Sequence, residues 1–148
     1  MRVEIRKAKT EEDENAVINA VEVTDSIRRA VDLLQGSGSG IPVFSGNDTL
    51  VVRNDQIYYI ESVDKRTYVY TKDNCYETKY RLYELEEILG FHFLRCSKAM
   101  IVNIRKIRSV RAELNARMSV ELLNGERIII SRGYVKDLKK KLGVKSYE

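Results

Sequence analysis

"FLRCSKAMIVNIRKIRSV", residues 93–110, combines side chains that belong in a protein core with cations spaced between them. Its apolar residues include Phe93, Met100, Ile101, Val102, Ile104 and Ile107, and its cations are Arg95, Lys98, Arg105, Lys106 and Arg108. The short apolar runs predict two buried strands, FHFLRC and AMIVNI. Lys98, Arg105 and Lys106 are then expected to project from the connections.

The sequence around this stretch has the two-residue period of strands. TLVVR (49–53) and QIYYIES (56–62) predict single strands, and residues 66–80 predict a hairpin that reverses near Asp73-Asn74. KIRSVRAEL is expected to pair with RMSVELLNGERIIISR. Asn124-Gly125 in the latter segment is the strongest hairpin signal in the chain.

Two short helices are predicted among these strands. In residues 81–90 the side chains Leu82, Leu85 and Leu89 form one stripe, and Gly90 ends the run. A second helix is predicted over 132–142, with Ser131 as N-cap and with Val135, Leu138 and Leu142 on one face. The fold class is therefore mainly β with short helices.

The N-terminal part is expected to be a separate strand and helix extension. MRVEIRKA and AVINAVEV predict short strands, and Thr24 is expected to cap a helix over 24–35 that Gly36 ends. GSGSGIP (36–42) predicts a flexible break that contains the only proline of the chain. These features divide the chain into an extension, residues 1–45, and a main domain, residues 46–148.

Charge is distributed unevenly along the 148 residues, whose net charge is +4. Residues 1–53 contain seven Lys/Arg and nine Asp/Glu, whereas 95–117 contain seven basic residues and only Glu113 as an acid. Segment 127–145 likewise contains seven basic residues and only Asp137 as an acid. Two basic segments that flank a hairpin favour a polyanionic partner, although solvated faces would give the same pattern.

Several classes of site are disfavoured. No apolar run approaches the ~20 residues of a membrane span, and MRVEIRKAKTEEDE lacks a signal core, so a cytoplasmic location is expected. Cys75 and Cys96 form no close pair, and His92 is the only histidine, which disfavours metal sites and Ser-His chemistry. No phosphate-binding glycine motif occurs. We expect neither an enzyme nor a cofactor.

The order of motifs resembles the LytTR-type DNA-binding domain of bacterial response regulators. The segments that carry this resemblance, over about residues 54–143, are DQIYYIES, YVYTKD, LYELEEIL, FLRCSKAMIVNIRKI and LLNGERIIISRGYVKDLKKKL. The resemblance implies an elongated arrangement of small antiparallel sheets. It also implies that loops, not a recognition helix, contact double-stranded DNA.

The resemblance assigns DNA contacts to three loops. The first contains Asp64, Lys65 and Arg66, the second Arg95, Ser97 and Lys98, and the third runs from Ser131 to Lys136. Base edges in the major groove are assigned to Lys98, Arg132, Lys65 and Arg66. Phosphates are assigned to Arg95, Ser97, Arg105, Lys106, Ser131, Tyr134 and Lys136. The sequence departs from the family pattern at Ser97-Lys98-Ala99 and at Gly133, where a basic residue is common.

The N-terminal 53 residues are too few for a phosphorylatable receiver domain. We therefore expect a stand-alone transcription regulator that binds repeated half-sites as a homodimer. Asn103 is expected to cap backbone groups in a turn, not to contact DNA.

Two alternatives stay open. The first is RNA or single-stranded binding through Tyr58, Tyr59, Tyr68, Tyr70, Tyr76 and Tyr80, although these tyrosines suit packing better. The second is a protein-interaction module with a basic face.

Overall fold

The computed structural model describes residues 1–35, 40–90 and 92–143, and it leaves the side chains of Asp32 and Gln35 undescribed. The chain divides into two units, Met1–Ser37 and Gly38–Glu148. The predicted break at 36–42 lies partly outside the described residues. Its described remainder, residues 40–42, begins a strand.

Helix α1, Asp25–Gln35, is present in the N-terminal unit where the sequence predicts it. Thr24 caps this helix, because its Oγ1 accepts a hydrogen bond from the backbone N–H of Ile27 at 3.3 Å. The position of the helix and its N-cap are therefore confirmed.

The two strands predicted before α1 are wrong. Residues 1–24 contain one short 3₁₀ turn, Glu11–Asp13, and no strand. Val3, Ile5, Val17 and Val21 are exposed. An alternating pattern of β-branched residues stabilises a strand only when a neighbouring strand pairs with it and one face is buried. Neither condition is met within these residues, so α1 is the only element longer than one turn in residues 1–35.

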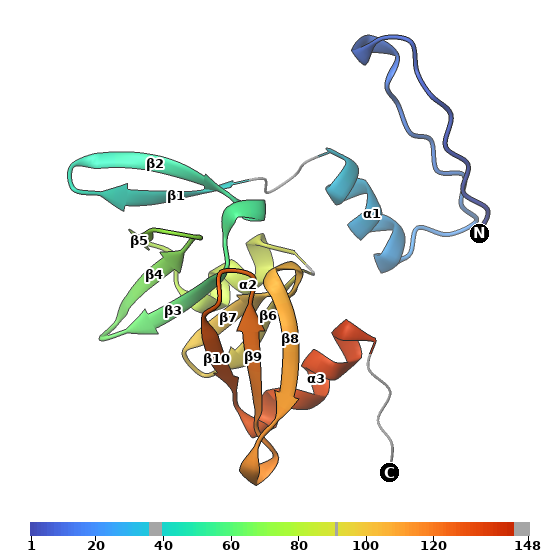
Figure 1. Cartoon of the computed structure of the whole chain (residues 1–148). Coiled ribbons are helices and arrows are strands. Elements are labelled where there is room, and N and C mark those ends of the chain that lie inside the picture. The colour runs from blue at the N-terminus through green and yellow to red at the C-terminus, as the bar shows by residue number, and fades with distance from the viewer. Residues whose placement is uncertain (36–39, 91, 144–148) are drawn as a thin grey trace. The chain divides into compact units, whose positions relative to one another are not determined.

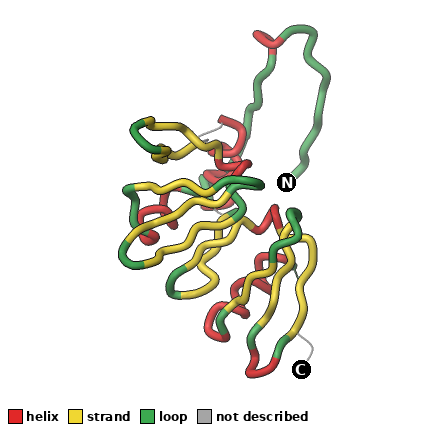
Figure 2. Tube along the Cα trace, turned by 60° about the vertical axis from the view of Figure 1, so that its left-hand side comes forward, coloured by secondary structure: helices red, strands yellow, loops and turns green. Residues whose placement is uncertain are grey.

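A large antiparallel sheet forms the centre of the second unit within the described residues (Figure 2). Its strands lie in the spatial order β2 (Asp48–Arg53), β1 (Gly40–Ser45), β5 (Cys75–Thr78), β4 (Arg66–Tyr70), β3 (Tyr59–Val63), β7 (Met100–Asn103) and β6 (Phe93–Ser97). Every neighbouring pair is antiparallel. The predicted hairpin over 66–80 is therefore confirmed, with Thr67 opposite Thr78.

A smaller sheet of β10, β9 and β8 packs beside the first (Figure 1). Its strands are β8 (Ile107–Ala112), β9 (Met118–Leu122) and β10 (Arg127–Ile130). The β9–β10 turn contains Asn124 and Gly125, and Gly125 has φ 89°, a conformation that glycine adopts without strain. The hairpin predicted from this pair is confirmed. Short 3₁₀ turns lie at Asn54–Gln56, Ile104–Lys106 and Leu114–Ala116.

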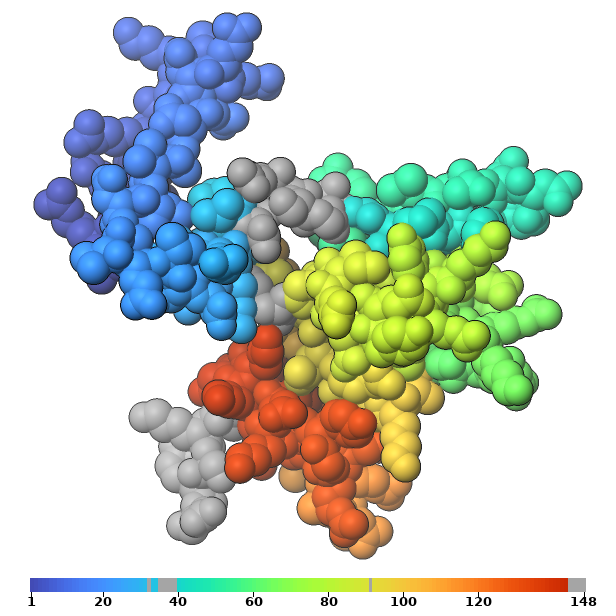
Figure 3. All heavy atoms as spheres, turned by 180° about the vertical axis from the view of Figure 1, so that it is seen from behind, coloured from blue at the N-terminus to red at the C-terminus, as the bar shows by residue number. Residues whose placement is uncertain are grey.

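Two helices cover the second unit, and Figure 3 shows them from behind, α2 in yellow-green and α3 in red. Helix α2, Leu82–Ile88, buries the predicted leucine stripe against the large sheet. Helix α3, Arg132–Leu142, buries Leu138 fully. Both helices begin and end within a residue or two of the predicted bounds.

The large sheet has an apolar core on each face. Ile60 and Ile101 face the core that α2 covers, whereas their neighbours Tyr59 and Val102 face the core that the small sheet and α3 cover. This alternation follows from the two-residue period of a strand. The Tyr59 hydroxyl also donates a 2.7 Å hydrogen bond to Glu126 Oε2 in the β9–β10 turn, which ties the two sheets together.

Strand β1 was not expected from the sequence. Proline is rare within strands because it cannot donate to a neighbour. Pro42 is tolerated because β1 pairs with β5 only at Phe44 and Glu77. On the edge of β1 that faces β5, Pro42 therefore has no paired residue that would need its missing N–H. Residues 40–45 thus belong to the large sheet, whereas the predicted boundary placed them in the N-terminal extension.

Candidate nucleic-acid interface

The first two predicted loops lie at the same end of the large sheet. Strands β3 and β7 are antiparallel with Glu61 opposite Met100, so the end of β3 lies beside the start of β7. The backbone N–H of Ser62 donates to the carbonyl of Ala99 at 2.8 Å. The β3–β4 turn and the β6–β7 turn are therefore neighbours, although about 33 residues separate them in sequence.

The third loop is joined to the second by a similar bond. The backbone N–H of Ser131 donates to the carbonyl of Cys96 at 2.9 Å, two residues before Lys98. Helix α3 packs against β6 and begins at Arg132. Figure 1 shows the β3–β4 turn, the β6–β7 turn and the start of α3 on the same side of this unit. The structure therefore brings the three loops together.

The cations on these loops are available to a ligand. Among the residues that the structure describes, the charged groups of Lys65, Lys98 and Arg132 have no ion-pair partner. Arg66 is less free, because its Nε lies 3.9 Å from Glu77 Oε1. An ion pair at that distance between exposed groups is weak. Unpaired cations grouped at one end of a sheet create a positive potential that attracts an anionic polymer.

The β3–β4 turn holds its residues in an unusual conformation. Val63 pairs with Arg66, so the turn has two central residues, Asp64 with φ 51° and Lys65 with φ 66°. Two positive φ angles are what a type I′ hairpin turn requires, and glycine is favoured at the second position. A lysine there stores strain, which is common at binding sites.

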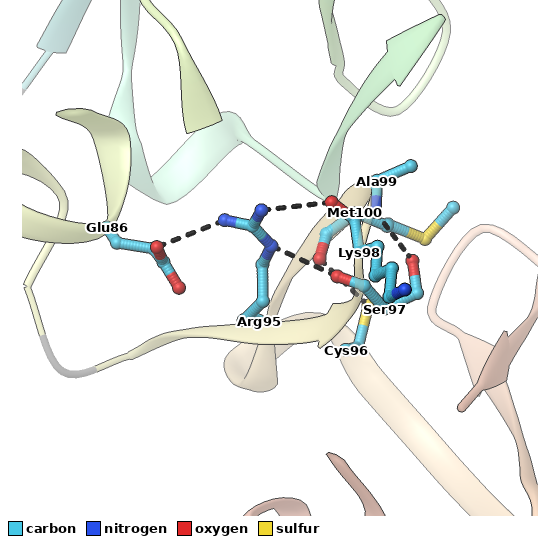
Figure 4. Close-up of polar contacts among 7 residues, drawn as sticks. All are labelled: Glu86, Arg95, Cys96, Ser97, Lys98, Ala99 and Met100. Carbon is cyan, nitrogen blue, oxygen red and sulfur yellow. Dashed lines mark hydrogen bonds and ion pairs between the residues drawn. The ribbon is translucent and has the colours of Figure 1, made fainter. Parts of the chain in front are cut away.

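Arg95, predicted to contact phosphate, points into its own turn. Its Nε and Nη2 donate to the carbonyls of Ser97 and Lys98 at 3.0 and 2.9 Å, and its Nη1 donates to Glu86 Oε2 at 3.0 Å (Figure 4). The Ser97 Oγ accepts a 3.2 Å hydrogen bond from the N–H of Ala99. Both side chains thus stabilise the turn that carries Lys98.

The residues predicted on α3 differ in their surroundings. Ser131 occupies the N-cap position, but its hydroxyl makes no capping hydrogen bond. Tyr134 is partly buried and packs against the second core. Lys136 is exposed one turn after Arg132, so both can face the same ligand.

Arg105 and Lys106 do not lie with the other predicted residues. They follow β7, whereas Lys98 precedes it. Four strand residues at ~3.3 Å each place them roughly 13 Å or more from the β6–β7 turn. The Lys106 Nζ lies 5.2 Å from the centroid of the Tyr58 ring. Arg105 instead lies near His92. Burial lowers the pKa of His92, and the positive charges of Arg105 and Lys141 lower it further.

Two further cations lie at the same sheet end but were not predicted. Because Thr67 pairs with Thr78, Lys79 returns beside Arg66. Lys65, Arg66, Lys79 and Arg81 all line one surface hollow. The Lys79 Nζ lies 5.2 Å from the centroid of the Phe44 ring. The hairpin predicted over 66–80 was the signal that could have found Lys79, because a hairpin returns its second strand to the level of the first.

Most of the tyrosines pack rather than stack on a ligand. Tyr58 and Tyr59 are buried, and the rings of Tyr59 and Tyr70 stack on each other with centroids 4.3 Å apart. Tyr76 and Tyr80 pack against the first core. These contacts remove most of the stacking surface on which the single-strand alternative depends.

Asn103 caps backbone groups as predicted. Its Nδ2 donates to the carbonyl of Ile57 at 2.8 Å, and its Oδ1 accepts from the N–H of Arg105 at 3.0 Å. Within the described ranges no group of three or more His, Cys, Asp or Glu residues is placed to hold a metal ion. No helix in those ranges is long and apolar enough to cross a membrane.

The residues of this surface lie within a segment that matches a known family of domains. The LytTr DNA-binding domain model matches residues 47–143. That range includes the three loops and the strands that hold them.

Individual proteins show the same similarity. The chain is 25% identical over 142 residues to an uncharacterized HTH-type transcriptional regulator of Staphylococcus aureus, covering 96% of this chain and 89% of that protein. It is 27% identical over 105 residues to the sensory transduction protein LytT of Enterococcus faecalis, covering 70% of this chain and 43% of that protein. Despite the name of the first relative, no two consecutive helices of this chain form a helix-turn-helix in the described ranges.

A solved structure is similar as well. The LytTr DNA-binding domain of a putative methyl-accepting/DNA response regulator from Bacillus cereus superposes with a TM-score of 0.68 and 29% sequence identity. The match covers 71% of this chain and 97% of that chain.

Proposed function

The chain belongs to the LytTr DNA-binding domain family, and from this membership we propose that it binds double-stranded DNA in a sequence-specific manner. Membership makes it a DNA-binding regulator. The proposal adds that loops at one end of the large sheet enter the major groove. The observation that carries it is the pair of backbone hydrogen bonds, Ser62 to Ala99 and Ser131 to Cys96, which group Lys65, Lys98 and Arg132.

We assign base contacts to the cations on these loops. Lys98, Lys65 and Arg66 extend from tight turns, and a lysine or arginine on such a turn can donate to guanine O6 and N7. Arg132 is the first residue of α3, where its side chain can reach a base while the helix N-terminus favours a nearby phosphate.

Phosphate contacts are assigned to the residues beside these cations. Ser97, Ser131 and Tyr134 carry hydroxyls that can donate to phosphate oxygens, and Lys136 supplies a charge one turn along α3. Arg105 and Lys106, at the other end of β7, would contact phosphates on a different part of the duplex. Such contacts add affinity without adding sequence information.

We also propose that two copies bind repeated half-sites. One set of three loops contacts only a short length of groove, and a second copy at a fixed spacing adds both affinity and register. Sedimentation of the protein with DNA that carries one or two half-sites tests this. Two copies are expected on the longer site, and one copy on both sites would contradict the proposal.

Selection from a random duplex pool tests sequence-specific binding directly. Enrichment of one motif is expected, with an affinity that falls steeply as salt is added because bound phosphates release counterions. The selected duplex is then compared with its single strands and with RNA of the same sequence. Recovery of no motif, or tighter binding to unpaired strands than to the duplex, would refute the proposed function.

A further inference from the structure

Four backbone groups of the β6–β7 turn are fixed by hydrogen bonds to side chains or to strand β3. The carbonyls of Ser97 and Lys98 accept from the Arg95 guanidinium, and the carbonyl of Ala99 accepts from the N–H of Ser62. The N–H of Ala99 donates to the Ser97 hydroxyl. Lys98 is exposed and is the only charged side chain at the two central positions of this turn.

The strand that leads into the turn is irregular at the same place. Arg95 pairs with Ile101 and Ser97 pairs with Met100, so Cys96 is an extra residue that forms a bulge. A bulge re-aims the side chains beside it and leaves nearby carbonyls without strand partners. Here the Cys96 Sγ is buried and donates to the carbonyl of Met100 at 3.5 Å. The Arg95 guanidinium bonds the carbonyls of Ser97 and Lys98 directly after this bulge.

Glu86 fixes the guanidinium from the opposite side (Figure 4). Its Oε2 accepts from Arg95 Nη1 at 3.0 Å, and the side chain of Arg95 is 23% exposed. Leu82, Leu85 and Leu89 anchor α2 to the sheet on either side of Glu86 in sequence. The planar fork of arginine suits this three-way role, because one guanidinium can donate in several fixed directions at once.

We propose that Arg95 and Glu86 are positioning residues that set the base preference of Lys98, and that Arg95 does not contact phosphate. This inference rests on the proposed function, because it concerns how that surface selects DNA. Two features support it. First, the guanidinium already donates hydrogen bonds to three protein oxygens. Second, the carboxylate of Glu86 beside it repels a phosphate.

Arg95→Lys and Glu86→Gln test the proposal, with Glu87→Gln as the matched control. Lysine keeps the charge of Arg95 but cannot bond two carbonyls and a carboxylate together. Glu87 is exposed on the same helix, so its substitution removes an equal charge without touching Arg95. Affinity is measured for the selected duplex and for a random-sequence duplex.

A positioning role predicts a loss of discrimination. Arg95→Lys should reduce the preference for the selected duplex by roughly tenfold while the random duplex binds as before. Glu86→Gln should reduce the preference in the same direction, and Glu87→Gln should leave it unchanged. A phosphate contact predicts the opposite pattern, in which Arg95→Lys binds both duplexes like the wild type and Glu86→Gln binds both more tightly. That pattern would overturn the proposal.

Amide exchange in the free protein tests, without DNA, whether the hydrogen bonds of Arg95 hold the β6–β7 turn in place. The N–H of Ser62 is protected by its bond to Ala99, so Arg95→Lys should accelerate its exchange by about tenfold through local opening. Unchanged exchange would overturn the proposal whatever the binding data show. The two proposals can fail separately. If the wild type binds no duplex but exchange of the Ser62 N–H accelerates in Arg95→Lys, the proposed function is refuted and the positioning role of Arg95 in the turn is retained.

Discussion

The backbone N–H of Ser62 donates a 2.8 Å hydrogen bond to the carbonyl of Ala99, and this bond joins two turns that are far apart in sequence. One turn carries Lys65 and the other carries Lys98. Because each turn is short and closed by paired strand residues, the bond fixes the relative position of the two lysine backbones. A surface that selects DNA sequence needs such fixed spacing, since base edges recur at fixed intervals along the groove.

Replacing Lys98 with alanine should weaken binding to the selected duplex by about 1–3 kcal/mol and relax the preference at one base pair. The reason is that its ammonium is unpaired within the described residues and is exposed on a rigid turn. Lys72→Ala removes the same charge from the β4–β5 turn at the opposite end of β4, and should cost much less. Fluorescence titration of both variants measures the difference. Equal losses would remove Lys98 from the base-contacting set.

Lys65→Gly should stabilise the fold and weaken DNA binding at the same time. A left-handed backbone costs an ordinary residue ~1–2 kcal/mol, more than glycine loses in entropy, so the free energy of unfolding should rise by about 0.5–1 kcal/mol. Urea unfolding and duplex titration measure the two effects. Lys65→Asn, whose side chain also tolerates positive φ, should lose binding to a similar extent. A variant that gains stability and binds normally would show that Lys65 makes no contact.

Lys79→Ala should weaken binding to every duplex alike. It lies beside Arg66 at the sheet end but on no turn that projects from it, so we expect it to neutralise a phosphate. Loss of one phosphate contact makes the negative slope of log affinity against log salt less steep by ~0.9. Binding measured across a salt series checks this. A change in base preference without a change in slope would contradict the assignment.

Asn103→Ala should destabilise the protein by about 2–4 kcal/mol, because its buried amide satisfies the carbonyl of Ile57 and the N–H of Arg105. Urea unfolding measures the loss, and the base preference of the folded variant should not change. Asn47→Ala, an exposed substitution in the β1–β2 turn, is the control and should have little effect. If Asn103→Ala is as stable as the wild type, those two hydrogen bonds do not hold the turn after β7.

Stability should decrease in alkaline solution because of Tyr70. Burial raises the pKa of the Tyr70 hydroxyl from its ordinary value of 10.0 to about 12, and Cys75 and Glu61 nearby act in the same direction. The unfolded chain therefore releases this proton first, so stability is intact below pH 10.0 and decreases as the pH rises toward about 12. Unfolding at neutral pH and at about pH 11 should show a smaller decrease for Tyr70→Phe. Identical pH profiles for the two proteins would refute the prediction.

The agreement between sequence and structure is closest where a feature depends on near neighbours. The Asn124-Gly125 turn, the leucine stripe of α2 and the Thr24 cap of α1 each involve residues within a few positions of one another. They form as predicted because local backbone preferences and a single buried face are enough to specify them. The N-terminal strands failed for the same physical reason, since a strand needs a distant partner that its own pattern does not contain.

The sequence by itself determined the elements of the main domain except β1, and it determined which residue types could contact DNA. Only the tertiary structure decided which of those residues share a surface. Lys65, Lys98 and Arg132 meet because backbone bonds join β3 to the β6–β7 turn and β6 to the start of α3. Arg105 lies elsewhere, although it is closer to Lys98 in sequence than Lys65 is. Arg95 turns inward because Glu86, on another element, is within its reach. Such pairings depend on packing between segments distant in the chain, and neither composition nor periodicity encodes them.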